Sequence, residues 1–140
     1  MGIEMSKGYK TLWEVIKETK EGKEYVNSQK QYENLEKVLA SLDIENVKMI
    51  NDEWRKITGA WYDDVEFNKL HIEEGGFVNA GDDGFYMDFR NWLLVQGEEL
   101  YKEMKERGHM AVVDYVNKHE IGESEYRFEC MVYALHPYLD

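Results

Sequence analysis

The sequence has little of what builds covalent or metal cross-links. Among its 140 residues there is one cysteine, Cys130, so no disulfide can form within the chain. None of the four histidines lies three or four residues from another, and no zinc-binding motif such as HExxH or CxxC occurs. We therefore expect no metal and no cofactor. We also expect Cys130 to be a buried structural thiol in a reducing, cytoplasmic protein.

Helix breakers and long apolar runs are also scarce. The single proline, Pro137, lies near the end of the sequence, so helices can run without forced interruption. No run approaches the ~20 apolar residues of a membrane span, and we expect no membrane partner. Glycines are clustered instead of scattered. Residues 74–84 contain four of them, which predicts a loop.

Charge of one sign dominates the chain. There are 29 acidic and 17 basic side chains, which give a formal net charge of -12. Such a protein repels phosphate backbones, so we expect no nucleic-acid partner. It would attract a basic protein, although strong acidity also serves solubility alone. Hydrophobic residues form 43% of the chain and aromatics 14%, enough for a core in a single helical domain over residues 1–140.

Apolar residues recur every three or four positions through most of the chain, which is the period of an α-helix. Residues 62–73 fit either a strand or a helix, and we favour a short helix after Asp64. The predicted fold class is all-α, an irregular bundle of five or six helices. Helices 43–61 and 83–107 are expected at its centre. The other predicted helices cover residues 11–20, 25–42 and 124–135, and residues 110–118 form a further short segment.

One stretch, GDDGFYMDFRNWLLVQGEELY from Gly81 to Tyr101, resembles a bacterial family known as domain of unknown function 4240. The shared pattern is a glycine-rich turn, two acids, an aromatic, Phe-Arg-x-Trp-Leu and a Gln-Gly pair. The segments LWEVIKE and EYRFECMVYAL resemble the start and the last helix of the family. The resemblance implies a helical bundle and no particular reaction. The matching residues are Gly81, Asp82, Asp83, Phe85, Phe89, Arg90, Trp92, Leu93, Gln96 and Gly97.

The first candidate site lies at the end of the glycine-rich loop. Asp82 and Asp83 could hold a divalent cation, but their place at a predicted helix start favours capping. Tyr86 and Arg90 follow at helical spacing, so an Asp-Tyr-Arg stripe could grip an anionic or planar ligand. We favour an internal ion pair between Asp83 and Arg90 that pins the loop to its helix.

The second candidate site is the sequence Trp61, Tyr62, Asp63, Asp64. All four tryptophans of the chain lie on apolar helical faces, so core packing is the first interpretation. Trp61 or Tyr62 could instead stand in an exposed patch. Acidic residues around an aromatic side chain suit a basic protein partner.

The leading functional hypothesis is therefore an acidic protein-binding module. Its narrowest form is an immunity-type protein that neutralises a basic toxin. The absence of a coherent catalytic set, including GxSxG and Walker motifs, favours a non-enzymatic role. The alternative is a small-molecule- or ion-binding domain, or an enzyme, built on Asp82, Asp83, Tyr86 and Arg90. A nucleic-acid mimic ranks third, because the acids are spread along the chain.

Overall fold

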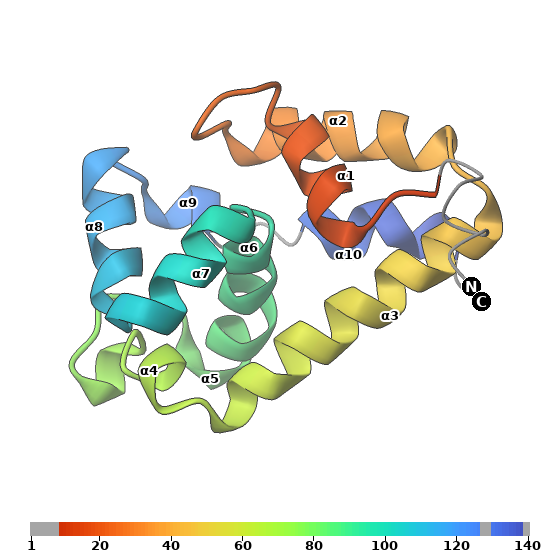
Figure 1. The fold of residues 1–140 in the computed structure, drawn as a ribbon. Helices are drawn as coiled ribbons and strands as arrows, with labels where there is room; N and C mark the ends of the chain where they lie inside the picture. Colours follow the sequence, from red (N-terminus) through yellow and green to blue (C-terminus); the bar gives the residue numbers. More distant parts are fainter. Residues whose placement is uncertain (1–8, 127–129, 139–140) are drawn as a thin grey trace.

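A computed structural model describes residues 9–126 and 130–138, and in these residues the predicted all-α fold is confirmed: helices are joined by turns, without a β-strand (Figure 1). None of the described helices is both long and apolar enough to span a bilayer. The helices are α1 (Leu12–Thr19), α2 (Ser28–Ala40), α3 (Ile44–Ala60), α4 (Val65–Asn68), α5 (Gly81–Gly84), α6 (Arg90–Leu94), α7 (Glu98–Arg107), α8 (Met110–Lys118), α9 (Glu123–Tyr126) and α10 (Cys130–Leu135). The π-helical turn η4 (Phe85–Phe89) joins α5 to α6, and the 3-10 turns are η2 (Trp61–Asp63), η3 (Ile72–Glu74) and η5 (His136–Tyr138).

Polar side chains at helix starts set two of the predicted boundaries. At α1, the Thr11 hydroxyl accepts the Glu14 amide at 3.2 Å, and the Glu14 carboxylate accepts the Thr11 amide at 2.9 Å. This is a complete capping box, in which two otherwise unpaired amides are satisfied. At α4, the Asp64 carboxylate accepts the Phe67 amide at 2.8 Å. The short helix expected after Asp64 is confirmed.

The single long helix expected from residue 83 to 107 is wrong. The chain is helical over 81–94, turns at residues 95–97 and starts again as α7. Gly97 has φ 114°, a value that side-chain-bearing residues rarely adopt. The buried Gln96 side chain holds the turn, because it donates to the Trp92 carbonyl at 3.0 Å and accepts the Tyr115 hydroxyl at 2.9 Å. Apolar spacing continues across the turn, so periodicity could not reveal it.

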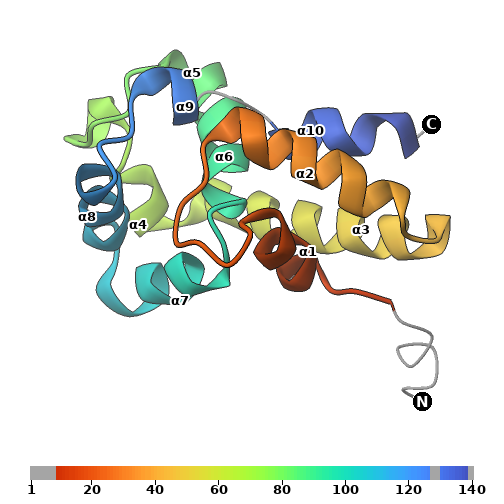
Figure 2. The same ribbon diagram turned by 90° about the horizontal axis from the view of Figure 1, so that it is seen from above.

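The helices enclose one hydrophobic cluster. In both ribbon views α10 lies against α2, and α3 runs along the side of the bundle (Figures 1 and 2). Helix α6 and η4 supply the centre, where Trp92 and Phe89 are fully buried beside Tyr126. The apolar side chains that recur at helical spacing along residues 85–104 are all buried, and they are Phe85, Phe89, Trp92, Leu93, Leu100 and Met104. The environment of the Cys130 thiol lies outside the described side chains.

Candidate functional site

Two candidate sites that are separate in the sequence meet in the structure. The Tyr62 ring from η2 stacks on the Tyr86 ring from η4, with centroids 5.0 Å apart and planes 19° from parallel. Asn68 ties both together, because it accepts the Tyr86 hydroxyl and donates to the Tyr62 carbonyl at 3.1 Å. The Arg90 guanidinium lies 4.5 Å from the Tyr62 ring centroid. Residues of both predicted sites therefore contribute to one surface.

Carboxylates surround this tyrosine pair. Glu73, Glu74 and Asp82 line a cleft of about 330 Å³ together with Tyr86. Burial raises the pKa of Tyr86, and the nearby charges of Asp82, Glu74 and Glu73 raise it further. Asp63 is exposed beside Tyr62, whose side chain is 50% exposed. The acid–aromatic face is defined here as Tyr62, Asp63, Glu73, Glu74, Asp82 and Tyr86.

The charge of the chain is concentrated in the segment that forms this face. Residues 61–90 contain eight acidic and two basic side chains, a net charge of -6, which is half of the total of -12. That segment makes up about a fifth of the chain. Because most of its acids are exposed, their potentials add over one part of the surface. The segment that holds half of the net charge thus also contains the exposed Tyr62.

His71, which the sequence did not single out, organises the floor of this cleft. It is 4% exposed, its Nδ1 accepts the Glu73 amide at 3.2 Å, and its Nε2 lies 3.1 Å from the Asp82 carboxylate. Since Nδ1 accepts, the ring proton belongs on Nε2, which donates to Asp82. The ligand atoms of His71, Glu73 and Asp82 lie within 4.8 Å of one another, close enough to suggest a metal centre. However, a metal on either ring nitrogen would break one of these hydrogen bonds, so the arrangement fits a structural histidine better than a ligand.

The acidic pair does not cap its helix as predicted. Ala80 occupies the N-cap position of α5, and no side chain bonds to the first-turn amides. Asp82 turns to His71 instead, while Asp83 remains exposed in the first turn. Both charges still complement the positive end of the helix dipole. The prediction was right about the location and wrong about the hydrogen bond.

The expected ion pair between Asp83 and Arg90 is also absent from the described residues. Arg90 donates to the Thr58 carbonyl at 3.2 Å and packs on Tyr62. The π turn η4 lies between the two residues and adds a residue to that turn. This rotates Arg90 away from the row that holds Asp83. Arg90 therefore ties the start of α6 to the end of α3, and Asp83 stays outside the cleft that Asp82 lines.

The residues of the second candidate site, 61–64, do not stay together: some lie in the core and others on the surface. Trp61 is 5% exposed and stacks on Phe67, with planes 2° from parallel, so it belongs to the core and not to a binding patch. Asp64 is occupied in capping α4. Tyr62 and Asp63 remain on the acid–aromatic face. Helical spacing could not make this division, because it depends on how η2 turns at the end of α3.

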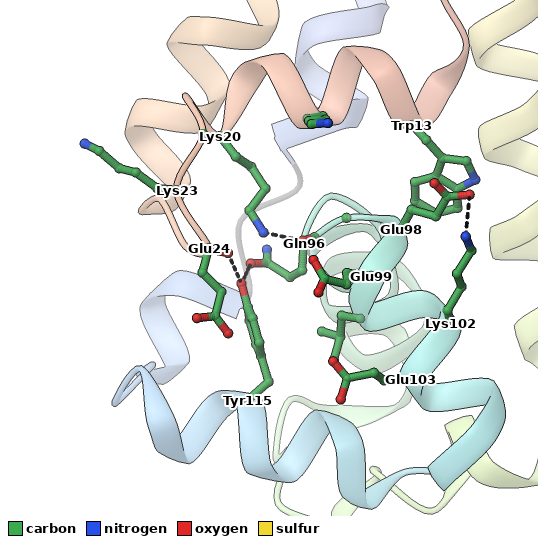
Figure 3. Close-up of a pocket in the computed structure, with 14 residues that line it drawn as sticks. Trp13, Lys20, Lys23, Glu24, Gln96, Glu98, Glu99, Lys102, Glu103 and Tyr115 are labelled. Atoms are coloured by element: carbon green, nitrogen blue, oxygen red, sulfur yellow. Dashed lines mark hydrogen bonds and ion pairs between the residues drawn. The ribbon is translucent and has the colours of Figure 1, made fainter.

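A larger cleft, of about 660 Å³, lies elsewhere, between the end of α1, the start of α7 and α8 (Figure 3). Lys20 reaches into it and donates to the backbone carbonyl of Gln96. The Tyr115 hydroxyl closes the same corner by donating to the Gln96 side chain and, at 3.2 Å, to the Glu24 carbonyl. Sequence reasoning missed this cleft, because its residues come from segments far apart. The Gln-Gly pair at Gln96 and Gly97 was the one signal that pointed to it.

Fold and surface together define an acidic all-α protein with an exposed acid–aromatic face. The chain belongs to the family described as protein of unknown function DUF4240, whose model matches residues 8–137. This confirms the resemblance seen around Gly81 to Tyr101 and extends it over nearly the whole chain. No curated protein and no solved structure shows significant similarity to it.

Proposed function

We propose that the protein is a protein-binding module that captures a basic partner on its acid–aromatic face. The observation that carries this proposal is that the segment with half of the net charge presents the exposed Tyr62, stacked on Tyr86, next to exposed carboxylates. Tyrosine is enriched in interfaces and hot spots, because its rigid ring offers much contact area at little entropic cost. Carboxylates around the ring would steer and pair with lysines and arginines of the partner. The face thus combines an anchor with a charged rim.

The fixed orientation of the Tyr62 side chain supports the proposal as well as the charge of the face does. Stacking on Tyr86 and packing under Arg90 hold Tyr62 in one orientation before any partner arrives. A preorganised side chain loses less conformational freedom on binding. An immunity-type protein that neutralises a basic toxin is the narrower form of the proposal. Fast capture through long-range attraction is the property that such a protein would need.

A small-molecule or ion site remains the alternative, now confined to the cleft beside the tyrosine pair. Asp82 and Tyr86 line that cleft, whereas Asp83 and Arg90 do not. Because three carboxylates line it, a small organic cation is the ligand that it would favour. A partner's lysine or arginine side chain would present the same chemistry.

Affinity capture with the purified protein as bait tests the proposal. The double variant Glu73→Gln/Glu74→Gln removes two charges from the face, and Asp52→Asn/Glu53→Gln removes two from the exposed surface of α3. We expect a basic partner that binds the wild type and the α3 variant alike. Its dissociation constant should rise about tenfold or more for the face variant and for Tyr62→Ala. Rising salt should weaken the wild-type complex.

Equal binding by the two double variants would show that net charge alone attracts the partner. Affinity that stays flat across the salt series would contradict charge steering. Methylguanidinium, titrated alone, separates the alternative from the main proposal. If it binds the wild type as tightly as the basic partner does, the cleft is a small-cation site and the protein interface is secondary.

A further inference from the structure

Three charged side chains that line the larger cleft form no ion pair among the described residues, and they are Lys17, Lys20 and Glu99. Most of the acids that line it are paired: Glu24 with Lys118 at 2.8 Å, and Glu98 with Lys102 at 3.8 Å. Glu103 is likewise paired with Arg107 at 3.2 Å. Glu99 is the one lining acid that forms no ion pair in the described part of the chain, and Lys20 is the less exposed of the two unpaired lysines, since Lys17 is exposed.

Lys20 is held in a position that leaves hydrogen-bond donors to spare. Its ammonium donates to the Gln96 carbonyl and lies 5.8 Å from the centroid of the Tyr115 ring. An ammonium has three donors, so two remain for a ligand. Burial lowers the pKa of Lys20, while the charges of Glu24 and Glu99 counter part of that effect. A partly desolvated cation of this kind gains from an anionic group brought to it.

Glu99 supplies the opposite charge from the other wall. Figure 3 shows its side chain pointing from α7 into the cleft that Lys20 enters from the end of α1. The two charged groups are more than 4 Å apart, because no ion pair joins them. Trp13, Leu100 and Tyr115 give the lining an apolar part. The cleft therefore presents a cation, an anion and an apolar wall within one small volume.

We propose that this cleft binds a small zwitterion of the α-amino-acid or short-peptide class. The carboxylate of the ligand pairs with Lys20, its ammonium pairs with Glu99, and its apolar part lies against the aromatic wall. Each charge of such a ligand meets an opposite charge that no ion pair of the described residues occupies. A ligand with a single charge would pair with either Lys20 or Glu99 and would leave the other charged group desolvated and without a partner. This site is separate from the acid–aromatic face, and the two proposals stand or fall independently.

Isothermal titration calorimetry of the wild type with the common α-amino acids and a set of glycyl dipeptides tests the proposal. We expect at least one zwitterion to bind, and the two panels distinguish free amino acids from short peptides. The N-acetyl and amide derivatives of that ligand should each bind about tenfold or more weakly, because each lacks one charge-assisted contact. Lys20→Met and Glu99→Gln should weaken binding to a similar extent.

Lys56→Met and Glu53→Gln, on the exposed surface of α3, are the matched controls and should bind as the wild type does. Circular dichroism verifies that each variant is folded. Glu99 is exposed, so Glu99→Gln provides a test even if Lys20→Met fails to fold. Three outcomes would overturn the proposal: no zwitterion binds, the derivatives bind as tightly as the parent ligand, or Glu99→Gln binds unchanged.

Discussion

At the scale of single residues, Gly59 and Gly97 have opposite roles. Gly97 has φ 114° and ψ 168°, a region that is essentially restricted to glycine. Gly59 lies within α3, and a Cβ built on it meets no atom within 4 Å. The same substitution by alanine should therefore have opposite effects at the two sites.

We predict that Gly97→Ala lowers the free energy of unfolding by about 1–3 kcal/mol, because alanine is strained in that backbone conformation. Contact is not the cause, since the nearest atom to an added Cβ is Lys20 Nζ at 3.7 Å. Gly59→Ala should raise the free energy of unfolding by about 1 kcal/mol, because alanine is the better helix former. Urea denaturation followed by circular dichroism measures both. Destabilisation by Gly59→Ala would show that α3 is bent or crowded at that position.

At the scale of elements, a carboxylate links α4 to the turn between α7 and α8. Glu66 accepts the His109 backbone amide and contacts the His109 ring, both at 2.9 Å. The hydrogen bond from the His109 side chain, followed by that from its amide, lowers the pKa of Glu66 to about 2. Gly108 permits the approach, because a Cβ on it would lie 2.3 Å from the Glu66 carboxylate.

The pKa of Glu66 predicts how stability changes in acid. Its folded value lies below the ordinary 4.5, so its contribution is complete above pH 4.5 and is lost as the pH falls towards 2. Unfolding midpoints measured across this range should fall less steeply for Glu66→Gln than for the wild type. Glu53→Gln, an exposed change on α3, should follow the wild-type curve. Parallel curves for Glu66→Gln and the wild type would mean that the link contributes nothing to stability.

At the scale of the whole molecule, a net charge of -12 acts against the folded state through mutual repulsion. Raising the ionic strength from about 0.01 M to 0.15 M shortens the Debye length from about 30 to 8 Å. We predict that the melting temperature rises over that range. At low salt Glu73→Gln/Glu74→Gln should be more stable than the wild type by up to about 0.5 kcal/mol, because two like charges are removed. Loss of stability in this variant, measured by differential scanning fluorimetry, would show that these carboxylates are structural.

Much of the architecture could be predicted from local pattern. The capping box at Thr11, the short helix after Asp64 and the buried face along residues 85–104 each depend on side chains close together in the chain. The spacing of residues in the sequence predicts such interactions, because a helix brings together residues that are three or four positions apart. The all-α class follows from the same periodicity. The family resemblance around Gly81 could likewise be seen in one continuous stretch.

Tertiary structure alone decided where the candidate sites lie. The break at Gly97 depends on Gln96 meeting Tyr115, and the stacking of Tyr62 on Tyr86 depends on how η2 and η4 pack. Partners such as His71 for Asp82, or Lys20 for Gln96, come from different segments of the chain, and helical spacing holds no information about them. Composition determined how acidic the protein is. The sequence also places half of the net charge in residues 61–90, but which of those acids lie beside Tyr62 and Tyr86, and which charges in the larger cleft stay unpaired, depends on contacts that form only when the helices pack.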